Sequence, residues 1–123
     1  MSRQERWGLA AGVAVVLMTG AVLAQPNPEA AKLVNPVKVT PESLAAGEQV
    51  YAKACRSCHA RDGSGGLGVS LVDDEWNHGS TDGEMFVVIR DGGAQFMEAW
   101  GDRYSDTQLW SVVNYIRSLK PAK

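Results

Sequence analysis

Cys55-Arg56-Ser57-Cys58-His59 is the stretch that decides the fold, because two thiols three residues apart are followed directly by an imidazole. At the end of a helix, both thiols can reach vinyl groups on one edge of a porphyrin, and the histidine then lies under the iron. This Cys-x-x-Cys-His spacing is the attachment motif of a c-type haem. The motif therefore predicts one covalently attached haem c, bound through Cys55 and Cys58, with His59 as the proximal iron ligand.

Three other uses of the motif fit the sequence less well. A structural zinc site needs four ligands, and the motif offers three, with His78 or a carboxylate left to supply the fourth. A dithiol redox motif is expected in a βαβ context, for which the sequence gives no sign. A disulfide between Cys55 and Cys58 would suit an exported protein but would leave the adjacent His59 without a purpose.

The N-terminus has the pattern of an export signal. Arg3 and Arg6 precede an uncharged run over residues 8–24, which ends in a small residue suited to cleavage. Since a spanning helix needs about 20 apolar residues, this glycine-containing run is short for one. We expect a signal peptide over residues 1–24 and a mature chain in the periplasm. The alternative is an uncleaved membrane anchor, with the domain facing the periplasm.

Composition narrows the class of the remaining chain. The 123 residues are 45% hydrophobic and 21% charged, which suits one small globular domain rather than a disordered chain. The formal net charge of −2 argues against a nucleic-acid partner. Between Cys55 and Trp76 the chain has few large apolar residues, so this segment would not pack alone. A haem would supply apolar surface, stabilising the fold by about 25 cal/mol per Å² removed from water.

Residues 25–39 contain several prolines and are expected to form an extended arm. After this arm, the sequence marks the start of a helix at three places. Thr40, followed by a proline and a glutamate, suits the N-cap of a first helix. Thr81 and Glu84 have the spacing of a capping box at the start of a middle helix. Ser105 has the same relation to the glutamine three residues on, at the start of a last helix.

The helix ends and the apolar spacing complete an all-α prediction. Gly92 can close the middle helix, and Lys120-Pro121 ends the last one. The last helix carries an apolar stripe made of Leu109, Val112, Val113, Ile116 and Leu119. No segment alternates as a strand does. We expect residues 40–123 to form one domain, with about three main helices and long loops around a haem.

The second iron ligand is expected to be Met97. Met85 lies in the apolar stripe of the middle helix, where methionine commonly fills a core. Met97 lies in the loop over residues 92–101, which is long enough to cross a flat cofactor, and a soft thioether favours ferrous iron. His78 is the rival ligand, but its polar surroundings favour a surface position.

The chain resembles the small, single-haem class I cytochromes c from about Val39 to Leu119. The likeness rests on the Cys-x-x-Cys-His motif, the Met97 loop and the two terminal helices. In that family these helices cross at a small residue and aromatics, a pattern matched here by Gly47, Tyr51, Val112 and Tyr115. The stretch over residues 71–79 also resembles cytochrome domains of respiratory oxidases and periplasmic alcohol dehydrogenases.

Two positions depart from the family's pattern. Glu98 replaces the proline that often follows the methionine ligand, so the loop loses a rigid residue and gains a charge. Val69 stands where a proline carbonyl often holds the ligand imidazole. Because a backbone carbonyl survives this change, the hydrogen bond can survive with it.

The resemblance implies an electron carrier rather than an enzyme. Its partners would be a protein donor, such as a dehydrogenase or a respiratory complex, and an acceptor, such as a terminal oxidase. The alternative is a haem enzyme or gas-binding module of peroxidase-like chemistry, which needs a displaceable sixth ligand. Glu98 is the feature that keeps this alternative open. The acidic run over residues 73–75 is expected to be a solvated loop.

Overall fold

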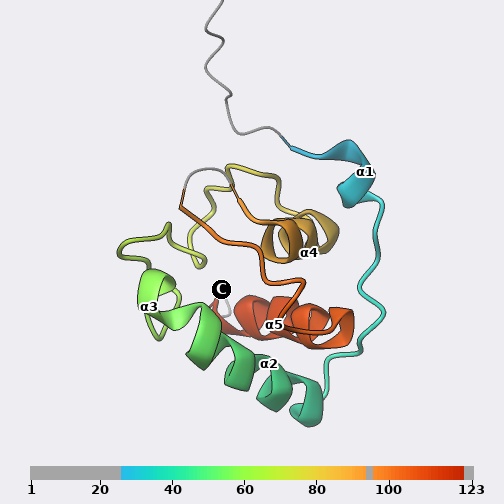
Figure 1. Ribbon diagram of the computed structural model, residues 1–123, viewed down its shortest axis with the longest axis horizontal. Helices are drawn as coiled ribbons and strands as arrows, with labels where there is room; N and C mark the ends of the chain where they lie inside the picture. The colour runs from blue at the N-terminus through green and yellow to red at the C-terminus, as the bar shows by residue number, and fades with distance from the viewer. Residues whose placement is uncertain (1–25, 94–95, 121–123) are drawn as a thin grey trace, which may run out of the picture.

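The computed structural model describes residues 26–93 and 96–120, and the expected signal peptide over residues 1–24 lies outside them. The described residues form helices joined by loops and include no strand (Figure 1). The expectation of an all-α fold is therefore confirmed, and no helix among these residues is long and apolar enough to span a membrane. The helices are α1 (Pro28–Ala31), α2 (Pro41–Ala54), α3 (Arg56–His59), α4 (Asp82–Asp91) and α5 (Asp106–Leu119).

The three long helices begin at the residues that the sequence marks. The Thr40 side chain accepts a hydrogen bond from the Ser43 amide, and the Ser43 side chain accepts one from the Thr40 amide. The same reciprocal capping box forms at Thr81 for α4 and at Ser105 for α5. Each box satisfies two amides that a helix end would otherwise leave unpaired. Gly92, with φ of 91°, then ends α4.

Helices α2 and α5 cross in close contact, as Figure 1 shows. A β-carbon added to Gly47 would lie 2.1 Å from the Ser111 carbonyl oxygen, so only glycine lets the two backbones come this near. Tyr51 and Tyr115 pack beside this point, with ring centroids 5.2 Å apart. Val112 is fully buried there.

The hydrophobic core lies among α2, α4 and α5. Its largest stacked pair is Phe86 of α4 and Trp110 of α5, whose rings lie 3.9 Å apart and almost parallel. Met85 is buried beside them, as expected for a core methionine. No hydrophobic residue between positions 56 and 84 belongs to this buried core. That segment instead makes the loops around the functional site.

The N-terminal arm differs from the expected extended segment by one helical turn. Asn27 caps α1 by accepting hydrogen bonds from the amides at positions 29 and 30, and the proline after Asn27 occupies the first helical position. The arm is fastened at both ends. The Asn27 amide donates to the Glu84 carboxylate at 3.2 Å, and Asn35 donates to the Asn114 side-chain oxygen at 2.8 Å. Gly83 allows α1 to lie directly on α4.

Candidate haem site

The Cys-x-x-Cys-His motif occupies the junction of α2 and α3. Cys55 ends α2 and begins α3, and its carbonyl accepts hydrogen bonds from the amides of Cys58 and His59 at 3.2 and 3.0 Å. This single turn places all three side chains along one opening. Cys55 is only 6% exposed, whereas Cys58 is exposed, and both thiols are free.

Burial sets the chemistry of the inner thiol. It raises the pKa of Cys55 to about 12, and the nearby Cys58 adds a smaller effect in the same direction. Desolvation disfavours the thiolate, so the Cys55 thiol stays protonated at neutral pH.

The His59 ring is held from behind by a backbone carbonyl. Its Nδ1 lies 2.8 Å from the Val69 oxygen. Since a carbonyl can only accept, Nδ1 is the donor in this contact, and Nε2 is the nitrogen that a neutral imidazole would offer to a metal ion. The hydrogen bond expected to survive at Val69 is present.

Gly68 determines how closely the loop approaches this imidazole. A β-carbon at Gly68 would lie 2.7 Å from His59 Cε1 and 2.9 Å from Nδ1. The loop is also fastened to the motif, because the Gly68 amide donates to the Cys58 carbonyl at 2.8 Å. The Tyr51 hydroxyl donates to the Ala60 carbonyl at 2.6 Å and so fixes the turn that follows His59.

The motif opens onto a cavity of about 870 Å³, a size typical of sites for cofactors and small molecules. Cys55, Cys58, His59 and Met97 all line it. So do the other two candidate ligands, Met85 and His78. Much of the remaining wall is apolar and includes Leu67, Val69, Leu71, Trp76, Val88 and Ile89. The structure thus brings every predicted site residue to one cavity.

The Met97 loop is fastened to the end of α4. The Trp100 amide donates to the Ile89 carbonyl and the Gly101 amide to the Arg90 carbonyl, both at 3.0 Å. A β-carbon at Gly93 would lie 3.6 Å from the Met97 sulfur, so the side chain packs over this glycine. These contacts give the half-buried Met97 a defined place on the cavity wall.

Glu98, the departure beside Met97, has a partner that the sequence did not reveal. Its carboxylate lies 2.9 Å from a guanidinium nitrogen of Arg103, and that guanidinium lies over the Trp100 ring. The pair is exposed, so it contributes less than about 1 kcal/mol. It nevertheless joins two parts of the loop where the family often has proline.

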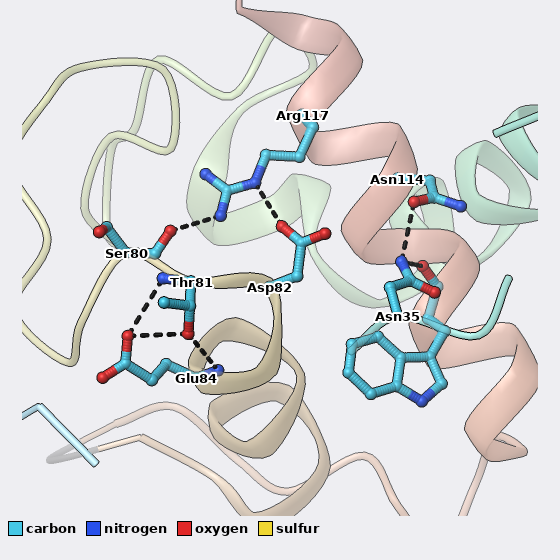
Figure 2. Close-up of polar contacts among 8 residues, drawn as sticks. Asn35, Ser80, Thr81, Asp82, Glu84, Asn114 and Arg117 are labelled. Carbon is cyan, nitrogen blue, oxygen red and sulfur yellow. Dashed lines mark hydrogen bonds and ion pairs between the residues drawn. The ribbon is translucent and has the colours of Figure 1, made fainter. Parts of the chain in front are cut away.

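A second polar cluster holds the loop that follows the glycine-rich segment (Figure 2). Arg117 of α5 donates to Asp82 at 2.9 Å and to the Ser80 carbonyl at 2.5 Å. Its guanidinium also lies 5.3 Å from the centroid of the Trp76 ring. Sequence reasoning missed Arg117, which lies on the polar side of the apolar stripe and whose contacts all lie far away in the chain.

Glu84 fastens the other side of the same loop. Its carboxylate accepts hydrogen bonds from the Thr81 amide at 3.1 Å and the Thr81 hydroxyl at 2.9 Å, besides the one from Asn27 (Figure 2 shows the Thr81 contacts). The Thr81 amide is the main cause that lowers the pKa of Glu84. Gly79, with φ of 94°, leaves room for the carboxylate. In the acidic run, Asp73 and Glu75 are exposed, and Asp74 pairs with Lys120.

The described residues give no support to the alternative of a structural zinc site. Over residues 26–93 and 96–120, no group of three or more His, Cys, Asp and Glu side chains is placed to hold a metal ion.

Comparison with known proteins identifies the family. Residues 42–116, more than half of the chain, match the family model described as "Cytochrome C oxidase, cbb3-type, subunit III". The chain belongs to this family. It is a class I c-type cytochrome, and the resemblance inferred from the motif is confirmed.

Relatives of this cytochrome include subunits of cbb3-type cytochrome c oxidases. CcoP of Rubrivivax gelatinosus is 35% identical over 84 residues, which make up 67% of this chain and 28% of that protein. FixP of Azorhizobium caulinodans is 32% identical over 76 residues, 59% of this chain and 26% of that protein. The chain therefore spans little more than a quarter of the length of these relatives.

Solved structures give the same fold. Cytochrome cL of Methylophaga aminisulfidivorans matches with a TM-score of 0.63 and 25% identity, over 67% of this chain and 56% of that one. Cytochrome cL of Hyphomicrobium denitrificans matches with a TM-score of 0.61 and 28% identity, over 63% and 48%. These similarities confirm the predicted class I cytochrome c fold.

The residues of the cavity fit the haem c that the family implies. Two free thiols stand at one end, an imidazole oriented by the Val69 carbonyl stands beside them, and the surrounding wall is largely apolar. These are the groups needed to tether, ligate and desolvate a porphyrin.

Proposed function

We propose that this cytochrome passes single electrons between two protein partners in the periplasm through one haem c. Cys55 and Cys58 would hold the haem by thioether bonds, and His59 and Met97 would ligate its iron. When bound, the haem supplies a one-electron iron couple. The observation that carries the proposal is that His59, oriented by the Val69 carbonyl, lines the same cavity as Met97.

The chain's own residues would keep the site unchanged during electron transfer. The Val69 carbonyl and the close approach of Gly68 prevent the His59 ring from turning. The hydrogen bonds of the 100–101 backbone to α4 keep the Met97 loop in place. Two protein ligands leave no position for a substrate, and a fixed site needs little rearrangement when its charge changes. These properties suit an electron carrier rather than an enzyme.

The opening of the cavity offers a place for electrons to enter and leave. Cys58 is exposed there, and the neighbouring side chains of Leu67, Val69 and Phe96 are 92%, 56% and 99% exposed. Large apolar side chains gathered at one opening favour contact with another protein. The names of the relatives favour a terminal oxidase as acceptor or as the complex that contains this cytochrome. The donor would be a dehydrogenase or a respiratory complex.

Substitution of the two methionines tests the ligand set. Met97→Ala should keep the haem attached but abolish the weak far-red absorption band that His/Met-ligated ferric cytochromes show. Met85→Ala is the matched control and should keep the band, because Met85 is a buried core residue. Loss of the band in Met85→Ala alone would show that Met97 is not the ligand.

Two further measurements test the class of the protein. Haem staining of a denaturing gel should detect covalent haem, and its absence would support the zinc alternative. The reduced protein should bind carbon monoxide slowly and incompletely at neutral pH. Rapid and complete binding would instead establish the gas-binding or peroxidase-like alternative.

Mass spectrometry of the exported protein should give a chain that starts at Gln25; an intact N-terminus would establish the membrane-anchored alternative.

A further inference from the structure

One wall of the cavity depends on side-chain contacts for its position. Glu75, Trp76, Asn77, His78 and Gly79 line the cavity, yet they belong to no helix. Positions 75–80 contain a local turn at Asn77 and His78, and among the described residues none of them has a backbone–backbone hydrogen bond to another part of the fold. The wall must therefore be placed by the groups that reach it from elsewhere in the fold.

Arg117 makes three of these contacts at once. It donates to Asp82 at 2.9 Å and to the Ser80 carbonyl at 2.5 Å, and it lies over the Trp76 ring (Figure 2 shows the two hydrogen bonds). Its contacts thus lie on both sides of His78 in the chain. A planar guanidinium can make two hydrogen bonds in a fixed direction and stack on a ring, which an ammonium group cannot do.

His78 is a second imidazole on the same cavity as His59 and Met97. The chain contains only these two histidines. Among the described residues, the His78 ring has no hydrogen bond or ion pair, so its nitrogens are not engaged by another group. An imidazole is a competent ligand for haem iron and gives a lower reduction potential than methionine.

We infer that Arg117 is a positioning residue that keeps His78 away from the haem iron and thereby preserves Met97 as the second ligand. The inference rests on the proposed His59/Met97 haem. Without Arg117, the Trp76 ring loses its cation and the Ser80 carbonyl loses its donor. The 75–80 segment can then move, and His78 replaces Met97 on the iron.

Six forms of the haem-loaded protein test this role: the wild type, Arg117→Gln, Arg117→Lys, Asp82→Asn, His78→Ala and the double variant that combines Arg117→Gln with His78→Ala. The measurements are the far-red band of the ferric form, the reduction potential and the unfolding temperature. Arg117→Gln should lose the band and have a lower potential, and the double variant should regain both. Arg117→Lys should also lose the band, because it keeps the charge without the planar contacts. Asp82→Asn is a milder variant, because it removes the negative charge opposite Arg117 while an amide oxygen can still accept a hydrogen bond, and it should weaken the band.

The outcomes separate this inference from the function on which it rests. Unchanged band and potential in Arg117→Gln, with only a lower unfolding temperature, would reduce Arg117 to a structural role. Loss of the band that persists in the double variant would show that His78 is not the incoming ligand. Retention of the full band in Arg117→Lys would overturn the geometric argument. A wild type without the band would contradict the His59/Met97 ligation itself.

Discussion

Gly47 offers the most direct test of how the two terminal helices are packed. The Gly47→Ala substitution adds one methyl group at the crossing of α2 and α5. Its carbon would lie 2.1 Å from the Ser111 oxygen, 2.6 Å from the Ser111 carbonyl carbon and 2.9 Å from the Tyr115 β-carbon. Because the first two of these atoms are backbone, no change of side-chain conformation can relieve the contact.

The size of the effect follows from two opposing terms. Carbon and oxygen atoms ordinarily approach to about 3.3 Å, so the helices must separate by roughly 1 Å at this point. Overpacking of this kind costs about 1–3 kcal/mol, and a clash with backbone belongs at the upper end. Alanine recovers about 1 kcal/mol through its greater helix propensity. We expect a net loss of about 2 kcal/mol and, for a domain of this size, an unfolding temperature lower by roughly 8–16 °C.

Denaturant and thermal unfolding of the haem-loaded protein, followed by circular dichroism, measure this loss. Ala46→Gly is the matched control, because Ala46 is the exposed neighbour on the same helix. It should cost about 1 kcal/mol through propensity alone. If Gly47→Ala were as stable as the wild type or more stable, the close crossing of α2 and α5 would be wrong.

Three other substitutions test the site and its surroundings. Gly68→Ala should turn the His59 ring away from the Val69 carbonyl and lower the yield of haem-loaded protein. Gly66→Ala is the control and should keep the yield, because its added carbon would meet nothing nearer than 3.5 Å. Equal yields of the two variants would contradict the role of Gly68 in placing the imidazole. The lowered pKa of Glu84 stabilises the fold above the unfolded-state pKa, and this contribution is lost as the pH falls through the folded-state pKa. The denaturation midpoint of Glu84→Gln should therefore fall less steeply with acid than that of the wild type, and parallel curves would refute this role. Leu67→Asp, at the opening of the cavity, should leave the haem attached through Cys55 and Cys58 but slow electron transfer to a purified partner; an unchanged transfer rate would exclude the opening as the docking face.

The helices could be predicted because their signals are local. Each capping box places its two side chains three residues apart, so Thr81 and Glu84 define the start of α4 before any tertiary contact is known. The Cys-x-x-Cys-His motif is local in the same way. The carbonyl that orients His59 was also foreseen, because the proline expected at Val69 contributes only a backbone atom to the hydrogen bond.

The contacts that hold the cavity wall could not be predicted, because they join distant parts of the chain. Arg117 contacts Asp82 and Ser80, which precede it by 35 and 37 positions in the chain. Asn35 contacts Asn114, which follows it by 79 positions. A polar residue on a solvated helix face gives no sign of such a partner. The single turn of α1 was missed for a different reason. Its Asn-Pro start is a genuine helix signal, but the prolines around it favour an extended chain.

The distribution of buried residues explains why the sequence nevertheless pointed to a haem. The described hydrophobic core comes from α2, α4, α5 and their flanks, and the 56–84 segment adds no buried hydrophobic residue to it. A loop of this length normally lacks the burial needed to offset the entropy of ordering it. Here it curves round the cavity, with Leu71 and Trp76 on the wall and glycines close to His59. The loop thus lines the space in which the family's haem would lie, and a bound haem would supply the apolar contacts that the loop does not make with the core.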